Sequence, residues 1–394
     1  MDSLIPKWPS YTPEEIKKVE EIIKTGNVNY LYGSEGKAFE NEFSRYVGTN
    51  YAICIANGSL ALTAALNALN IGEGDEVITT PRTFVATASC IVLTGAKPVF
   101  ADIDRDSGNI TDKTIRQKIT SKTKAIVVVH LAGWPADMNS IKALATEKKI
   151  KLIEDCAQAH GAEINGKSVG SFGDVAAWSF CTDKIISTLG EGGMITTNDE
   201  KIWKSVWSYK DHGKSYDSVF VKKHPPGFRW LHDGFGNNFR LTEIQCAVGR
   251  IQLSKLKKCT EIRERNAMIL KSFLDGFPSL RIPITDNNTQ HAWYRFYAYV
   301  ESNALLTDWS RDRILAELNR NGIPAFSGSC SEIYMENAFK KSVYNQKDRL
   351  DNAKELGETS LAFFVHQTIS KKEMDYYAEN IHCLLYTSDA ADES

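Results

Sequence analysis

Short apolar runs alternate with helix-like segments through the first half of the chain. The strand-like runs lie at residues 51–56, 76–79, 98–102, 125–129, 151–154, 175–180 and 194–197. Between them, residues 60–69, 84–93 and 140–148 have the composition or the apolar spacing of helices. This alternation predicts an α/β fold with a mostly parallel central sheet flanked by helices. The loop between the last two runs is too short for a helical crossover, so we expect that pair to be antiparallel.

Other segments have a different character. Thr12, followed by Pro13 and two acids, is typical of the start of a helix, and Gly26 is expected to end it. Residues 209–238 are irregular and rich in glycine, lysine, histidine and aromatic residues, which is typical of a functional loop or a subunit contact. A strong helix is predicted at residues 241–256.

We therefore predict a large domain at residues 1–255, which includes the N-terminal helical segment, and a smaller C-terminal α/β domain at residues 256–382. Residues 383–394 resemble the translation of a sequencing adapter. We interpret them as a non-native tail and exclude them from the prediction of the fold.

Composition narrows the class of protein. The 394 residues include 47 Lys and Arg against 49 Asp and Glu, a balance that argues against binding to nucleic acid or to a membrane surface. No apolar run approaches the roughly 18 residues of a membrane span, and the N-terminus does not resemble a secretory signal, so we expect a cytoplasmic protein. The eight cysteines form no CxxC pair, and we interpret them as core thiols, with no metal site predicted.

The stretch from residue 153 to 198 concentrates the polar groups that suggest chemistry. Asp155 ends an apolar strand, and ligands bind at the carboxyl ends of strands in open α/β sheets. Taken alone, such an acid could simply be solvated or cap the next loop. Gln158 follows among small residues, which would let a flat ligand lie close to the backbone.

Lys184 lies in the loop after the next strand and precedes Gly190-Glu191-Gly192-Gly193. A single lysine is usually a solvated surface charge. Its position after a central strand and before a glycine-rich turn favours a different role. We expect desolvation to lower its pKa, so that the amine is nucleophilic and can form a Schiff base with a carbonyl.

A third feature is the turn Asn57-Gly58-Ser59, which joins a strand directly to a helix. Free N–H groups at a helix N-terminus bind anions. A lysine for an aldehyde, a carboxylate for a pyridine nitrogen and an anion site for a phosphate together predict pyridoxal 5'-phosphate as the cofactor.

Longer motifs carry a resemblance to a known family. In chain order they are GDEVITTPRTFVATA, GAKPVFADID, VHLAGWPADM, IEDCAQAHGA, GSFGDVAAWSF, GEGGMITTND after the lysine, and GNNFRLTEIQCAVGRIQL. Over about residues 5–382 the chain resembles the DegT/StrS family of pyridoxal-phosphate-dependent sugar aminotransferases, which have fold type I.

The resemblance implies roles for individual residues. Lys184 matches the Schiff-base lysine, Asp155 the partner of the pyridine nitrogen, and Gln158 the residue beside the phenolic oxygen of the cofactor. The other matches are the phosphate contacts Gly58, Ser59 and Ser179, the ring-stacking Phe84, and Asn238, which in the family reaches the phosphate of the neighbouring subunit. A homodimer with shared active sites is therefore expected.

The resemblance also implies a reaction. Relatives that deoxygenate sugars carry histidine at the position of Lys184, so the lysine favours amino transfer. We expect an amino acid, by family habit L-glutamate, to donate the amine to a nucleotide-linked 3- or 4-keto (deoxy)sugar for surface polysaccharide, O-antigen or related amino-sugar biosynthesis. Two alternatives are a transferase acting on a non-nucleotide cyclic ketone, of the aminocyclitol type, and a non-catalytic regulator on the same fold.

Two departures from the family pattern affect these expectations. The usual Ser-Gly-Thr phosphate turn is Asn57-Gly58-Ser59, which retains a hydroxyl. Cys181-Thr182-Asp183 replaces the usual residues before the lysine, which leaves the substrate preference open. The basic and aromatic loop at residues 222–230 is either a solvated flap or a site for the diphosphate or base of the substrate.

Overall fold

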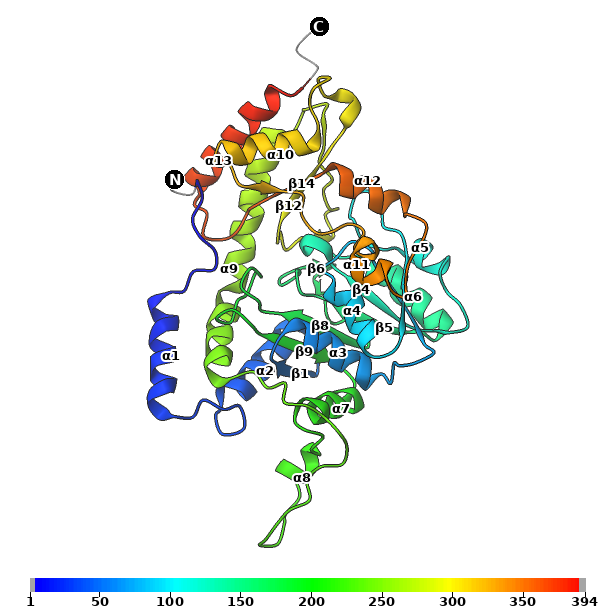
Figure 1. The fold of residues 1–394 in the computed structure, drawn as a ribbon. Coiled ribbons are helices and arrows are strands. Elements are labelled where there is room, and N and C mark those ends of the chain that lie inside the picture. Colours follow the sequence, from blue (N-terminus) through cyan, green and yellow to red (C-terminus); the bar gives the residue numbers. More distant parts are fainter. Residues whose placement is uncertain (1–3, 390–394) are drawn as a thin grey trace.

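A seven-stranded sheet forms the centre of the larger part of the molecule (Figure 1). The computed structural model describes residues 4–389. The strand order is β1-β9-β8-β5-β4-β2-β3, with bounds Tyr51–Ile55, Gly193–Thr197, Val175–Ser179, Lys151–Asp155, Thr123–Val129, Glu76–Thr79 and Lys97–Phe100 in that order. β8, β5, β4, β2 and β3 are parallel, whereas β9 runs antiparallel to both of its neighbours. The predicted fold class and the predicted antiparallel pair are both confirmed.

Helices cover both faces of this sheet because successive residues of a strand point to opposite sides. Ile53 of β1 packs under one layer of helices, whereas Cys54 packs under the other. The first layer comprises α3 (Gly58–Ala68), α4 (Ala86–Leu93) and α7 (Glu200–Lys210). The second layer comprises α2 (Glu35–Val47), α5 (Asp112–Arg116), α6 (Met138–Lys148) and α9 (Glu243–Leu274).

Helix α9 is much longer than the prediction of residues 241–256. It has 32 residues and joins the large sheet to the smaller part of the molecule (Figure 1). Beyond residue 256 its buried positions include Thr260, Arg263 and Asn266, so the apolar pattern fades while the helix continues. The proposed domain division after residue 255 falls inside this helix.

The smaller part is built on a four-stranded antiparallel sheet of order β10-β12-β14-β13. Its strands are Leu280–Arg281, Phe296–Val300, Ser360–Phe363 and Ala325–Phe326 in that order. Helices α10 (Arg311–Arg320), α12 (Asp351–Thr359) and α13 (Lys371–Tyr386) accompany it. This combination of strands and helices agrees with the α/β character predicted for the smaller C-terminal part. Helix α13 includes the first residues of the 383–394 tail, and residues 390–394 lie outside the described residues.

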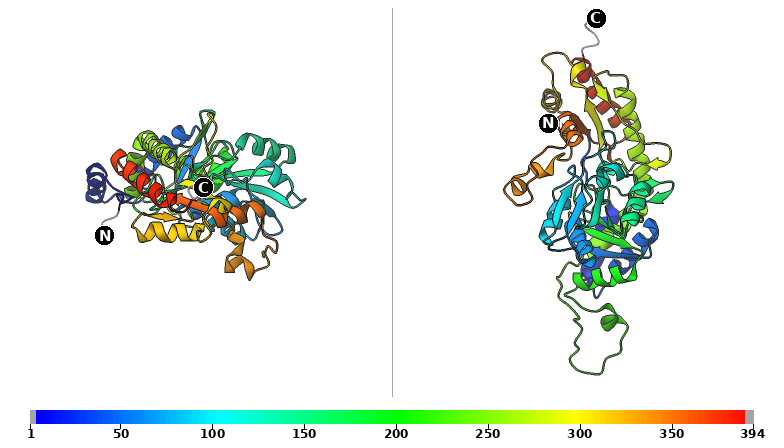
Figure 2. Two further views of the ribbon diagram at one scale, coloured as in Figure 1. Left: turned by 90° about the horizontal axis from the view of Figure 1, so that it is seen from above. Right: turned by 90° about the vertical axis from the view of Figure 1, so that its right-hand side faces the viewer.

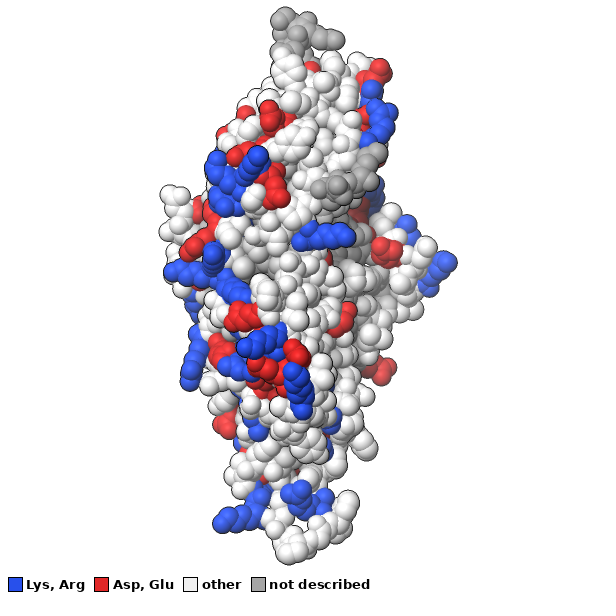
Figure 3. Space-filling view, turned by 90° about the vertical axis from the view of Figure 1, so that its left-hand side faces the viewer, with Lys and Arg blue, Asp and Glu red and all other residues white. Residues whose placement is uncertain are grey.

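The N-terminal helix α1 (Pro13–Thr25) begins and ends as predicted, with a capping box from Thr12 to Glu15 and a left-handed Gly26. Figure 3 views the molecule from the side that carries α1 and shows Lys and Arg intermingled with Asp and Glu. The remaining elements are α8 (Tyr216–Phe220), α11 (Asn337–Lys340), β6 (Glu163–Ile164), β7 (Lys167–Ser168), β11 (Thr289–Gln290) and the 3-10 turns Leu131–Gly133, Ser302–Ala304 and Ile333–Met335. No helix in residues 4–389 is long and apolar enough to cross a membrane.

An arm formed by residues 212–239 projects from the large sheet (Figure 2). It contains α8 and otherwise lacks helices and long strands, as the sequence predicted. At its base, the buried Asp211 carboxylate accepts hydrogen bonds from Arg240 Nε at 2.8 Å and from Lys214 Nζ at 2.9 Å. Burial alone would raise the pKa of Asp211, but the hydrogen bonds and charges of these two cations lower the pKa to about 2.

Because the pKa of Asp211 is lower in the folded chain than in the unfolded chain, its contribution to stability is present above the ordinary aspartate pKa of about 4 and is lost as the pH falls below it. We expect Asp211→Asn to lower the midpoint of thermal unfolding at pH 7, and this difference to shrink toward pH 3. The control is Asp217→Asn, which removes a more exposed pairing with Lys204 and should have little effect. An Asp211→Asn midpoint equal to that of the unmodified protein at pH 7 would contradict this account.

Candidate active site

Strand β5 carries two consecutive acids that point to opposite sides of the sheet. Glu154 is fully buried and accepts N–H groups from Gly170, Phe172 and Gly173 at 2.7, 2.8 and 2.7 Å. Asp155 faces a cavity on the other side. Because successive side chains of a strand point to opposite sides, the Glu154 carboxylate binds the loop that precedes β8 and the Asp155 carboxylate faces the cavity.

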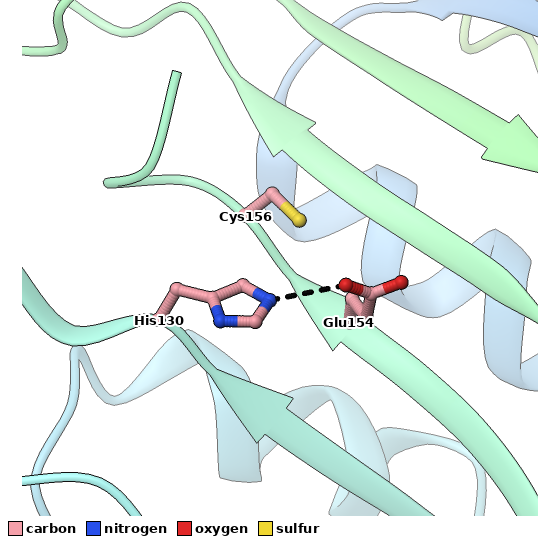
Figure 4. Close-up of side chains that lie close together, drawn as sticks. All are labelled: His130, Glu154 and Cys156. Carbon is pink, nitrogen blue, oxygen red and sulfur yellow. Dashed lines mark hydrogen bonds and ion pairs between the residues drawn. The ribbon is translucent and has the colours of Figure 1, made fainter. Parts of the chain in front are cut away.

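His130, Glu154 and Cys156 lie close enough together to suggest a metal site (Figure 4). Their hydrogen bonds give a structural explanation. His130 Nδ1 accepts the N–H of Ala136 at 3.1 Å, so the proton is on Nε2, which donates to Glu154 at 3.2 Å. Since both ring nitrogens are used and Glu154 also accepts three N–H groups, we interpret His130 and Glu154 as a buried pair that positions the loop before β8, and Cys156 as a neighbouring core thiol.

A cavity of about 510 Å³ lies at the carboxyl ends of β4, β5 and β8. This is the edge at which open α/β sheets bind ligands. Seven of the eight residues singled out from the sequence line it, namely Gly58, Ser59, Phe84, Asp155, Gln158, Ser179 and Lys184. The fold therefore brings together residues that are up to 126 positions apart in the chain (184 − 58 = 126).

Asp155 is buried in the floor of this cavity. Its Oδ2 accepts a hydrogen bond from the Thr87 hydroxyl at 2.8 Å, and its Oδ1 accepts one from the N–H of Ala157 at 3.2 Å. Burial raises the pKa of Asp155, while these two hydrogen bonds and the charge of Lys184 act in the opposite direction. A cation beside this carboxylate would favour its ionised form.

The anion site predicted at Asn57-Gly58-Ser59 has the geometry of a capped helix start. Asn57 Oδ1 accepts the N–H of Leu60 at 2.9 Å, and the N–H groups of Gly58 and Ser59 have no acceptor within residues 4–389. A Cβ at Gly58 would lie 2.7 Å from the Cβ of Ser179. Only glycine therefore lets the helix start approach the end of β8 this closely.

Two further side chains are oriented toward the same cavity. Phe84 lines it with 66% of its surface exposed, which is unusual for a large aromatic residue and leaves a free ring face. Gln158 Oε1 accepts the N–H of Ala132 at 2.7 Å. Its amide nitrogen has no acceptor in the described part of the chain, so it is available to donate to a ligand.

Lys184 also lines the cavity, but the predicted direction of its pKa shift is wrong. Burial does lower the pKa of Lys184, as predicted, but Tyr294 and the Asp183 carboxylate outweigh burial, so the pKa is raised overall. Lys184 Nζ lies 3.4 Å from the Tyr294 hydroxyl and 3.5 Å from Asp183 Oδ1. The prediction of a lowered pKa was wrong because it omitted these two groups.

A second cavity, of about 500 Å³, adjoins the first and shares Lys184, Asp183, Phe84, Gln158 and Thr83 with it. Apart from Val85, its other lining residues come from the smaller part and include Tyr294, Arg295, Tyr297, Phe326 and Ser329. Sequence reasoning did not single out the residues of this wall or Thr87. The WYRF motif at 293–296, polar and aromatic at the start of a buried strand, is the signal that could have identified Tyr294 and Arg295.

Asn238, the eighth predicted residue, is exposed on the arm and does not line either cavity of this chain. Its predicted contact is with a neighbouring subunit, and that contact stays a prediction.

Comparisons with known proteins identify the family. The model of the DegT/DnrJ/EryC1/StrS aminotransferase family matches residues 9–382. The aminotransferase from Psychrobacter cryohalolentis is 48% identical, with a TM-score of 0.95 over 97% of this chain and 99% of its own. S. venezuelae DesV, solved in complex with a ketimine intermediate, is 28% identical, with a TM-score of 0.84 over 95% of this chain and 94% of its own. The dTDP-3-amino-3,6-dideoxy-alpha-D-galactopyranose transaminase of Aneurinibacillus thermoaerophilus is 35% identical over 84% of this chain and 86% of its own.

The first cavity is suited to the cofactor of this family. A buried carboxylate, an exposed aromatic ring, free N–H groups at a helix start and a lysine amine all face the same space. These are the groups that a pyridine ring, a phosphate and an aldehyde require. The chain therefore belongs to the DegT/DnrJ/EryC1/StrS aminotransferase family and is a pyridoxal-phosphate-dependent sugar aminotransferase.

Proposed function

We propose that the enzyme moves an amino group from an amino acid, with L-glutamate as the expected donor, to a nucleotide-linked 3- or 4-keto (deoxy)sugar. The observation that supports this most directly is the position of Lys184, whose amine lies where two cavities of about 510 and 500 Å³ adjoin. One cavity has the groups that suit the cofactor. The other has polar and aromatic walls, Tyr297 and Ser329 among them, that suit a sugar.

The cofactor, when bound, supplies an aldehyde that condenses with amines and a ring that withdraws electrons from the reacting carbon. Gly58 and Ser59 would hold its phosphate, Phe84 and Gln158 would orient its ring, and Asp155 would keep its ring nitrogen protonated. Lys184 Nζ is the group placed to remove a proton from the reacting carbon and return it. Asp183 and Tyr294 would hold that amine in position between proton transfers.

We further propose that two copies of the chain share their active sites, with Asn238 of each arm reaching the other copy. The exposed fractions of Phe228 and Trp230 on the arm, 79% and 84%, support a role in contact with another chain. By the same reasoning from the family, the product would enter surface polysaccharide, O-antigen or related amino-sugar biosynthesis. We also propose that the enzyme is cytoplasmic.

A panel of ketones tests the substrate class. The purified enzyme is incubated with glutamate and, separately, with dTDP-, UDP- and GDP-linked 3- and 4-keto sugars and with free cyclic ketones, and products are identified by mass spectrometry. We expect amination of at least one nucleotide-linked keto sugar. Amination of the free cyclic ketones alone would instead support the aminocyclitol alternative.

Removal of the lysine amine tests its assigned role. We expect Lys184→Ala to lower turnover by about 10³-fold or more, because both the covalent attachment and the proton transfer are lost. Lys204→Ala, which removes an exposed amine of α7, should leave turnover unchanged. Analytical ultracentrifugation should show the same oligomer for both variants. Appreciable transamination by Lys184→Ala would contradict the assignment.

The close approach at Gly58 provides a test of the phosphate site. We expect Gly58→Ala to weaken cofactor binding by about tenfold or more, because the added methyl group overlaps Ser179. Ser179→Gly relieves that overlap, so the double variant should bind more tightly than the sum of the two single effects predicts. Titration of the absorbance of bound cofactor measures all three variants. Simple additivity would exclude the proposed steric coupling.

A further inference from the structure

The Asp183 carboxylate connects three groups on the wall between the two cavities. Its Oδ1 lies 3.5 Å from Lys184 Nζ, and its Oδ2 lies 3.7 Å from Arg295 Nη2 and accepts a hydrogen bond from the Tyr294 hydroxyl. The Asp183 side chain is 49% exposed, whereas those of Lys184 and Arg295 are each 15% exposed. One carboxylate group therefore spans the space between an amine and a guanidinium.

Arg295 is held in place independently of Asp183. Its Nη1 donates to the backbone oxygen of Tyr294 at 2.9 Å, and its guanidinium carbon lies 4.3 Å from the ring centre of Tyr294 and 4.9 Å from that of Phe364. Packing between aromatic rings fixes the plane of the guanidinium fork. Nη2 thus remains directed at the shared wall, where Asp183 is its partner.

This region contains more positive than negative charge. Arg263 is fully buried near Arg295, and its Nη2 has no hydrogen-bond partner within residues 4–389. Burial, and then the charge of Arg295, lower the pKa of Arg263 to about 9. Burial and the charges of Arg263 and Arg295 also lower the pKa of His366, to about 3. An additional anion beside Arg295 would reduce this repulsion.

We propose that Arg295 binds the carboxylate of the amino-acid donor, which takes the place of Asp183 as the partner of the guanidinium. This proposal rests on the proposed amino transfer. An α-amino acid carries its carboxylate on the carbon that bears the amine, and Asp183 shows that a single carboxylate reaches from Lys184 to Arg295. In a nucleotide-linked sugar, ring atoms separate the keto carbon from the diphosphate. The distances therefore favour the carboxylate of the donor over the phosphates of the acceptor.

The two half-reactions can be measured separately, which tests this assignment. Arg295→Gln should raise the KM for glutamate by about 10- to 100-fold, the loss expected for a charge-assisted hydrogen-bonded pair. The KM for the keto sugar should change by less than about threefold. Arg295→Lys, which retains the charge without the fork, should recover part of the loss.

Arg313→Gln is the matched control. Arg313 also stacks on an aromatic ring, at 4.4 Å from the centre of Trp309, and donates to a backbone oxygen, that of Asp308, but it lies outside both cavities. Arg313→Gln should leave the KM for glutamate and the KM for the keto sugar unchanged. Thermal unfolding of each variant identifies any that fail to fold.

A binding measurement gives a second readout that does not depend on turnover. Calorimetric titration with 2-oxoglutarate, the keto acid of glutamate, should show weaker binding to Arg295→Gln. It should show tighter binding to Asp183→Asn, because the competing carboxylate has been neutralised. Weaker binding to Asp183→Asn would overturn the exchange of partners.

The outcomes separate this proposal from the proposed function. If the unmodified enzyme aminates no ketone with any amino acid, the proposed function fails. If it is active but Arg295→Gln leaves the KM for glutamate unchanged, only the role of Arg295 fails. A variant that loses affinity for the keto sugar alone would assign Arg295 to the acceptor and overturn the proposal.

Discussion

The two-residue period of strand β5 is the constraint on which the active site depends. It directs Glu154 into the protein and Asp155 into the cavity. Glu154 accepts three N–H groups from residues 170–173, and this buried, charge-assisted anchor sets the course of the chain into β8. Ser179 and Lys184 follow from β8, so one strand positions both the acid that faces the cofactor and the segment that carries the lysine.

Electrostatic balance around the lysine is the second determinant of the chemistry. Burial alone favours a neutral amine, whereas Asp183 and Tyr294 favour the ammonium form. A group that has to release and accept a proton in each cycle requires an environment that can change. Displacement of Asp183 by a donor carboxylate at Arg295 would supply such a change, because it alters the partners of both Lys184 and Arg295.

The sequence predicted the parts of the fold that local patterns determine. The strands of the large sheet and helix α1 follow from apolar spacing and capping residues. The family resemblance singled out eight residues, and seven of them line one cavity. The length of α9 was not predictable from its apolar pattern, because Arg263 and Asn266 are buried through polar contacts. The direction of the Lys184 pKa depends on Tyr294, which lies 110 residues away, so it required the structure. The domain division at residue 255, the individual cofactor contacts and the reach of Asn238 stay predictions.

The central claim is that one pyridoxal phosphate occupies the cavity between Asp155, the start of α3 and Lys184. A crystal structure of the protein with this cofactor tests it most directly. The account predicts electron density continuous with Lys184 Nζ, a phosphate at the N–H groups of Gly58 and Ser59, and a ring nitrogen beside Asp155. A cofactor bound elsewhere, or a phosphate away from the start of α3, would contradict it.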